Sequence, residues 1–156
     1  MSRDTSRSLR HVQAVALAAY RLVIGFLFAC HGASTLFGLP DARMRFHGPV
    51  GEWPHWWGGV IELVGGVLVA AGCVTRGAAF LCSGTMAFAY FTVHAHKGLF
   101  PIANGGEAAV LFCWSFFVLV FLGPGAPSID GLVGARLRGG ARRSVAASRP
   151  GVVDVD

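Results

Sequence analysis

Four long apolar stretches dominate the sequence and constrain its fold more than any other feature. They cover about residues 12–39, 56–74, 77–94 and 107–122. A helix needs about 20 apolar residues to cross the hydrocarbon core of a bilayer. Only 13% of the residues are charged, about half of the fraction typical of a soluble domain. We therefore predict an all-α polytopic membrane protein, folded as a bundle of four transmembrane helices.

Short polar segments separate the stretches. Between the second and third stretches only Thr75-Arg76-Gly77 remains, which is enough for a tight helical hairpin. The segment 95–106 contains Pro101 and the turn sequence Asn104-Gly105-Gly106. We predict one transmembrane domain over residues 12–130, preceded by a basic N-terminus (1–11) and followed by a flexible Arg-rich tail (131–156).

The basic residues indicate the orientation of the chain. Eight of the 13 lie near the two ends: Arg3, Arg7, Arg10, Arg136, Arg138, Arg142, Arg143 and Arg149. An even number of crossings puts both termini on one side, and basic loops stay in the cytoplasm. With both termini cytoplasmic, Arg76 joins these eight inside, and Arg43, Arg45 and Lys97 lie outside. We predict a multi-pass protein of the bacterial cell (inner) membrane with N- and C-termini in the cytoplasm.

These basic ends also bear on nucleic-acid binding and on protein export. They hold no aromatic residue and they border apolar segments, so a role in membrane topology is favoured over nucleic-acid binding. A cleaved signal peptide ending near Cys30 is disfavoured because Arg21 interrupts the apolar region.

Two charged residues fall inside the stretches, where a charge costs roughly 2.5–3.5 kcal/mol on insertion scales. Arg21 lies in the first stretch and Glu62 in the second. Gly58, Gly59, Gly65 and Gly66 lie three and four residues from Glu62, so its face of the helix is expected to meet a neighbouring helix. A buried ion pair between Arg21 and Glu62 that sets the helix register is the structural interpretation.

The functional interpretation is a polar pocket in the outer half of the bundle, built from His31, Glu62, Tyr90, His94 and Glu107. Carboxylates and imidazoles in a site of low dielectric can relay protons, and such a pocket would suit a quinone headgroup. Glu62, His31 and His94 are the candidates for a catalytic role. No motif for haem, flavin or an iron–sulfur cluster is present, and the donor set is a weak signal for a metal, so we predict no metal site.

Five sequence features resemble motifs of the DoxX family of bacterial membrane proteins. Residues 31–38 (HGASTLFG) resemble its HGxxKLFG motif, and Arg21 matches an arginine upstream of that motif. Three further matches follow in order: ELVGG at 62–66 with ExxGG, FPIANGGE at 100–107 with FPxxNGGE, and GPGAPSID at 123–130 with GPGxxSxD. Thr35 stands where many relatives have lysine. With these motifs, the candidate ligand-binding residues are Arg21, His31, Glu62, Tyr90, His94, Asn104 and Glu107.

The resemblance implies a role in redox chemistry. The family takes its name from a membrane subunit of a thiosulfate:quinone oxidoreductase. Related actinobacterial proteins look like membrane anchors that assemble with a superoxide dismutase and a sulfurtransferase. The expected function is a membrane component of a redox complex that links thiol, sulfur or oxidative-stress chemistry to the quinone pool. If the chain is catalytic, it would be a subunit of a quinone-linked oxidoreductase.

Two alternatives stay open. One is a non-catalytic scaffold that recruits soluble redox enzymes. The other is a small transporter lined by Arg21 and Glu62, which would need to form a homo-oligomer because one bundle of four helices is small for transport.

Overall fold

The computed structural model describes residues 3–137, which form helices and their connections and contain no strand. Four long helices are joined by shorter helical turns, in the order α1 (Arg3–Phe37), η1 (Ala42–Met44), α2 (His55–Ala71), α3 (Thr75–Ala89), η2 (Tyr90–His94), η3 (Ala95–Lys97), α4 (Pro101–Asn104) and α5 (Glu107–Leu122). The predicted all-α fold is confirmed for this part of the chain.

Two helical stretches are long and apolar enough to cross a membrane by themselves. They are Thr5–Phe37, with 33 residues, and Thr75–Lys97, with 23 residues. The other two long helices, α2 and α5, have 17 and 16 residues and are also apolar. At 1.5 Å per residue they extend about 25 Å, slightly less than the hydrocarbon core of about 30 Å.

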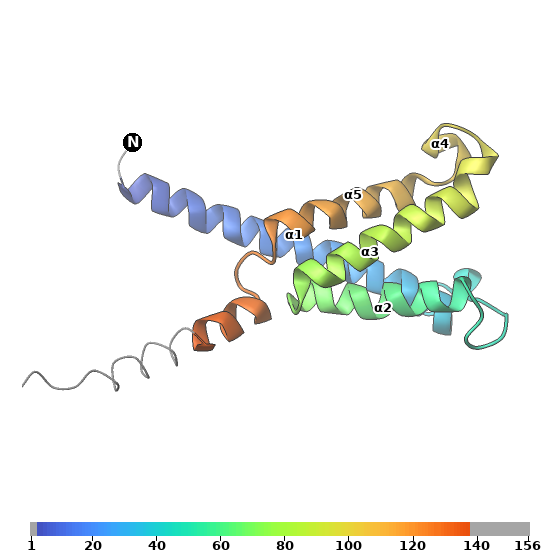
Figure 1. The fold of residues 1–156 in the computed structure, drawn as a ribbon, viewed down its shortest axis with the longest axis horizontal. Helices are drawn as coiled ribbons and strands as arrows, with labels where there is room; N and C mark the ends of the chain where they lie inside the picture. The colour runs from blue at the N-terminus through green and yellow to red at the C-terminus, as the bar shows by residue number, and fades with distance from the viewer. Residues whose placement is uncertain (1–2, 138–156) are drawn as a thin grey trace, which may run out of the picture.

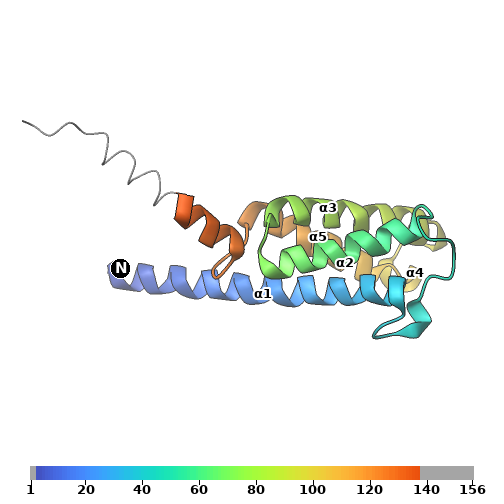
Figure 2. The same cartoon turned by 90° about the horizontal axis from the view of Figure 1, so that it is seen from below.

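The long helices lie side by side and alternate in direction (Figures 1 and 2). The most extensive contacts are those of α1 with α2 and of α3 with α5, and α2 also packs against α3. One end of the molecule carries residues 3 and 137, and we name it the terminal end. The opposite end carries the connections 38–54 and 90–106, and we name it the loop end. Figure 2 shows that α1 extends beyond the other long helices at the terminal end.

Glycines bring α1 and α2 into backbone contact. A Cβ atom built on Gly25 would lie 2.6 Å from the Gly66 carbonyl oxygen, and one on Gly32 would lie 2.6 Å from the Gly59 carbonyl oxygen. Real Cβ atoms do not approach a carbonyl so closely, so these positions of α1 need glycine. This is the close approach that small residues permit between membrane helices.

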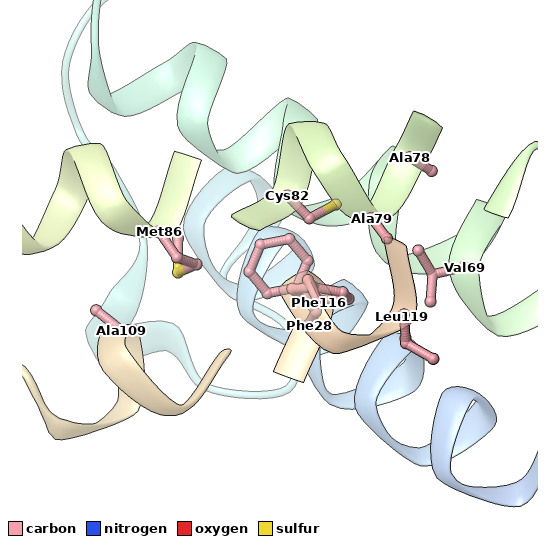
Figure 3. Close-up of a cluster of buried hydrophobic side chains, with 9 residues drawn as sticks. All are labelled: Phe28, Val69, Ala78, Ala79, Cys82, Met86, Ala109, Phe116 and Leu119. Carbon is pink, nitrogen blue, oxygen red and sulfur yellow. The ribbon is translucent and has the colours of Figure 1, made fainter. Parts of the chain in front are cut away.

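The core lies at the centre of the molecule and receives side chains from all four long helices (Figure 3). Phe28 of α1 and Phe116 of α5 are fully buried, with ring centroids 4.7 Å apart in an edge-to-face arrangement. Cys82 of α3 is buried in the same cluster. Many large apolar side chains instead face outward, among them Phe26, Trp114 and Phe121. A surface of this kind suits contact with lipid.

The turn between α2 and α3 comes three residues earlier than predicted. Helix α2 ends at Ala71 because Gly72 takes a left-handed conformation (φ 71°) and its N–H bonds to the carbonyls of Leu68 and Val69. Helix α3 then begins at Thr75. The hairpin turn is therefore 72–74 rather than Thr75-Arg76-Gly77.

The two ends of the described chain are more helical than predicted. Helix α1 begins at Arg3, so most of the predicted separate N-terminal segment continues the first helix. Residues 129–137 are helical, and this helix runs into the predicted flexible tail over residues 131–137. Ser128 starts this helix, because its hydroxyl accepts a hydrogen bond from the Gly131 N–H at 3.1 Å. The rest of the predicted tail, 138–156, lies outside the described residues.

Candidate functional site

A groove of about 620 Å³ lies between α2 and α3 at the loop end. Most of its lining comes from one stripe on each of these helices. The stripe of α2 runs from His55 to Glu62, and that of α3 runs from Phe80 into the following turn at Val93. Thr35 of α1 also lines the groove. We name this hollow the Glu62 groove.

The connection between α1 and α2 closes the loop end of the groove. The Phe46 N–H bonds to the Thr35 carbonyl at 2.8 Å, which ties this connection to α1. The Phe46 ring stacks on His55 with centroids 5.6 Å apart, and the Trp53 ring reaches Phe88 of α3 at 5.8 Å. An aromatic wall thus separates the groove from the surroundings of the loop end.

Of the described residues, Glu62 is the only acidic one that lines the groove. By position along the stripes it lies at the end away from the aromatic wall, about 10 Å into α2 from His55. Among residues 3–137, no hydrogen bond or ion pair reaches the Glu62 carboxylate, although the side chain is only partly exposed. A polar group in such surroundings is costly unless it finds a partner. The carboxylate is therefore placed to bind a group that enters the groove.

Two glycines that line the groove leave space rather than fill it. A Cβ atom on Gly58 or on Gly84 would meet no atom within 4 Å. These positions contrast with Gly25 and Gly32, where the space is filled by the facing helix. Gly58 and Gly84 therefore contribute room to the groove.

A second polar cluster lies at the loop end, on the other side of α3. The Asn104 amide nitrogen donates to the Gly98 carbonyl at 2.8 Å and to the Tyr90 hydroxyl at 3.4 Å. Its amide oxygen accepts from the Gly106 N–H at 2.8 Å. The His94 Nδ1 atom lies 3.2 Å from the Asn104 carbonyl oxygen. Asn104 thereby orders the turn that leads into α5.

The chain between α3 and this cluster forms a π-helical turn at Tyr90–His94. Such turns interrupt the register of an α-helix and are frequent at functional sites. Here the turn rotates Tyr90 and His94 toward Asn104, and neither residue lines the Glu62 groove.

Arg21 forms a third polar cluster, at the terminal end of the bundle. One guanidinium nitrogen donates to the carbonyls of Val69 and Ala70, at 2.9 and 2.7 Å, and the other donates to the Pro127 carbonyl at 2.8 Å. The expected ion pair with Glu62 is absent from the described residues. It fails because Arg21 reaches the last turn of α2, where the C-terminal carbonyls of the helix attract a cation.

Asp130 completes the cluster at the terminal end and was not a candidate from sequence alone. Its carboxylate accepts from the Val74 N–H at 2.7 Å and from the Thr75 N–H at 2.9 Å, so it caps the start of α3. Burial raises the pKa of Asp130, but these hydrogen bonds and the charge of Arg21 outweigh it, so the pKa falls below its ordinary value. The matched GPGxxSxD motif contained this residue, but nothing in the motif showed which helix it would cap.

The structure separates the residues that the sequence grouped into one pocket. Tyr90, His94 and Asn104 lie together at the loop end, and Glu62 lies in the groove. His31 packs its ring against Phe112 of α5 at 5.4 Å and does not line the groove. Glu107 is exposed at the first position of α5.

Comparison with known proteins agrees with this helical, apolar architecture. The sequence profile of the DoxX family matches residues 16–95, a range that holds Arg21, His31, Glu62 and the groove helices α2 and α3. An uncharacterized protein of Haemophilus influenzae is 44% identical over 117 residues, covering 73% of this chain and 87% of the relative. No solved structure matches the chain. The chain is a membrane protein that belongs to the DoxX family.

Proposed function

We propose that this DoxX-family protein is an integral membrane component of a bacterial redox complex, and that it links thiol, sulfur or oxidative-stress chemistry to the quinone pool. The site of contact with the quinone is the Glu62 groove. The observation that carries the proposal is the Glu62 carboxylate, which no described residue pairs, in a groove walled mainly by apolar and aromatic side chains.

The groove has the composition that a quinone ring requires. Ligand pockets are mostly apolar and carry a few polar groups that fix orientation. The aromatic rings of Phe46, Trp53 and Phe88 provide surfaces for a planar ring, and Glu62 provides one hydrogen-bonding group for a ring oxygen. Arg45 adds a cationic donor near the loop end of the groove.

The chemistry balances with a dithiol as reductant. Two thiols and one quinone give one disulfide and one quinol, with two electrons and two protons passing from the thiols to the ring. In this reaction Glu62 in its protonated form donates one proton to a ring oxygen, and one of the two protons released by the thiols, carried by water at the groove, reprotonates Glu62. The thiols belong to a soluble partner, for which enzymes of the superoxide dismutase and sulfurtransferase type are the candidates.

The topology that supports this role has four membrane crossings, with the terminal end in the cytoplasm. The alternation of the four long helices, with the start of α1 and the helix 129–137 at the same end, supports an even number of crossings. The bias of basic residues toward the chain ends supports a cytoplasmic location for that end. The Glu62 groove then lies in the outer half of the membrane.

Binding of a quinone analogue to the purified protein in lipid nanodiscs tests the proposal. Glu62→Gln should weaken binding by about tenfold, since it exchanges a carboxyl group for an amide at the ring oxygen. Glu107→Gln is the matched control, because Glu107 is an exposed acid of α5 that does not line the groove. Equal binding by the native protein and Glu62→Gln would rule out the groove as the quinone site.

A non-catalytic scaffold is the second candidate. It is favoured by the helix 129–137 at the terminal end, whose side chains at Ile129, Leu132 and Leu137 are exposed and so available to a partner. Under this alternative, deletion of residues 131–156, which removes Leu132 and Leu137, releases the soluble partners in a mild-detergent pull-down, and Glu62→Gln has no effect on the cell's redox balance. Retention of all partners after the deletion excludes a scaffold that works through this segment.

A further inference from the structure

The Glu62 groove is continued by a second, smaller hollow across α3. This hollow has a volume of about 310 Å³ and lies between α3 and α5. Ala87 of α3 and Trp114 and Phe117 of α5 are among its lining residues. Phe80 and Gly84 line both hollows, so the two share an edge on the outward face of α3.

Gly84 leaves this shared edge without a side chain. It is exposed, and a Cβ atom added there would meet nothing within 4 Å. Phe80 lies one turn before Gly84 and Phe88 one turn after, and both rings are substantially exposed. The missing side chain therefore leaves a gap between two projecting rings, and this gap joins the hollows.

The second hollow offers hydrocarbon surface and almost nothing else. Its one hydroxyl, on Ser83, donates to the Cys113 carbonyl at 2.9 Å. The indole of Trp114 and the ring of Phe117 form its α5 wall, and both are exposed on the side away from the core. Apart from the indole N–H of Trp114 and the thiol of Cys113, the lining offers a polar ligand little, whereas an alkyl or isoprenoid chain gains aromatic contact.

We propose that the two hollows form one site for an amphipathic lipid that has a small polar ring and a long hydrocarbon chain. The ring lies beside Glu62, and the chain crosses α3 at Gly84 and lies against Trp114 and Phe117. This inference rests on the proposed function, because it takes the Glu62 groove as the ring site. It assigns the hydrocarbon chain of that membrane quinone to the second hollow, with entry sideways from the bilayer.

The hydrocarbon chain of the ligand is expected to raise the binding affinity only moderately. In a bilayer the free chain is already surrounded by hydrocarbon, so the hydrophobic effect does not drive it into the hollow. The gain comes from dispersion contacts with ordered aromatic rings. Several-fold tighter binding is the scale to expect, and it must be separated from simple partitioning into the membrane.

Two benzoquinones with the same ring test the inference, one without a side chain and one with a decyl chain. Their affinities for the protein in nanodiscs are compared at equal mole fraction in the bilayer. The decyl compound should bind several-fold more tightly. Ala87→Leu should remove that advantage and leave the affinity of the chain-free compound unchanged, because Ala87 lines only the second hollow. Ala108→Leu is the control, since Ala108 is exposed on α5 and lines neither hollow.

A photoreactive group at the end of the chain adds a positional readout. Cross-links should fall on the peptide that holds Trp114 and Phe117, and they should be lost in Ala87→Leu. Cross-links spread evenly over all outward-facing helices would overturn the inference.

The outcomes separate this inference from the proposed function. If the ring binds in a Glu62-dependent way and the chain adds nothing, the chain site is wrong and the quinone site stands. If neither compound binds, or Glu62→Gln changes nothing, the proposed function fails and the chain site fails with it.

Discussion

Asp130 and Thr75 are 55 residues apart in the chain, yet the Asp130 carboxylate accepts both the backbone N–H and the hydroxyl of Thr75, at 2.9 and 2.8 Å. The link holds the segment that follows α5 against the start of α3. Arg21 of α1 donates hydrogen bonds to the Pro127 carbonyl of the same segment and to the last carbonyls of α2. These two side chains join α1, α2, α3 and the chain beyond α5 at the terminal end.

Asp130→Ala should lower the free energy of unfolding by about 1–2 kcal/mol, the usual cost of losing a helix N-cap. Thermal unfolding in detergent, followed by circular dichroism, measures the change. Asp41→Ala is the control, because Asp41 also caps a helical turn, at the Arg43 N–H, but is exposed and local. An equal effect of the two substitutions would show that the Asp130 link contributes no more to the free energy of unfolding than a local cap does.

The stability should depend on pH through Asp130. Its pKa in the folded protein is below the ordinary value of 3.8, so the stabilisation is complete above that value and is lost as the pH falls through the lower folded pKa. The melting temperature of the native protein should therefore fall more steeply between about pH 5 and 3 than that of Asp130→Asn. Parallel curves for the two proteins would contradict this assignment.

Arg21→Met should destabilise the protein by about 3 kcal/mol, because it removes the guanidinium donor from the Ala70 and Pro127 carbonyls and one of two donors from the Val69 carbonyl. Arg21→Lys should recover only part of this loss, since one ammonium group cannot reproduce the planar fork that reaches Val69, Ala70 and Pro127. Survival of folded protein after heating, measured by size-exclusion chromatography, ranks the three proteins. A native-like Arg21→Lys would mean that charge alone matters.

Two glycine substitutions should have opposite signs. Gly66→Ala should destabilise the protein, because its Cβ would lie 2.6 Å from the Gly25 carbonyl oxygen and would push α1 and α2 apart. Gly84→Ala should stabilise it by about 0.5–1 kcal/mol, since the new methyl meets no atom and alanine favours the helix. Melting temperatures of the two variants, measured side by side, check the prediction. Stabilisation by Gly66→Ala would show that the α1–α2 glycines are not packing positions, and destabilisation by Gly84→Ala would contradict the open space at that position.

Glu62→Leu should raise the melting temperature while it abolishes quinone binding. The carboxyl group has no described partner in an apolar groove, so its removal relieves a desolvation cost. A lowered melting temperature would instead indicate that Glu62 serves the fold. The opposite changes in stability and binding are the signature of a residue kept for a ligand.

Much of the fold could be predicted because apolar runs of this length require helices that cross a membrane. A bilayer requires long helices with internally paired backbones, and a run such as 107–122 has no other stable conformation there. The predicted range for the fourth helix agrees with α5, at Glu107–Leu122. Boundaries that depend on distant capping were missed, as at Thr75, whose helix start is fixed by Asp130.

The candidate site could be predicted only in part, for a geometric reason. Sequence spacing orders residues along one helix, so it picked out Glu62 as a polar residue on a glycine-rich face. Sequence spacing does not show how neighbouring helices are rotated relative to each other. For this reason the sequence grouped Glu62 with His31 and His94, which the structure places outside the Glu62 groove.

The sequence by itself determined that this chain is a helical membrane protein with costly polar residues at Arg21 and Glu62. Hydrophobic length and charge are local properties, and they can be read without knowing which helices touch. Only the tertiary structure decided that Arg21 closes the terminal end on backbone carbonyls, while Glu62 stays without a described partner in a groove. That difference depends on which helix each side chain faces, and helix packing alone sets it.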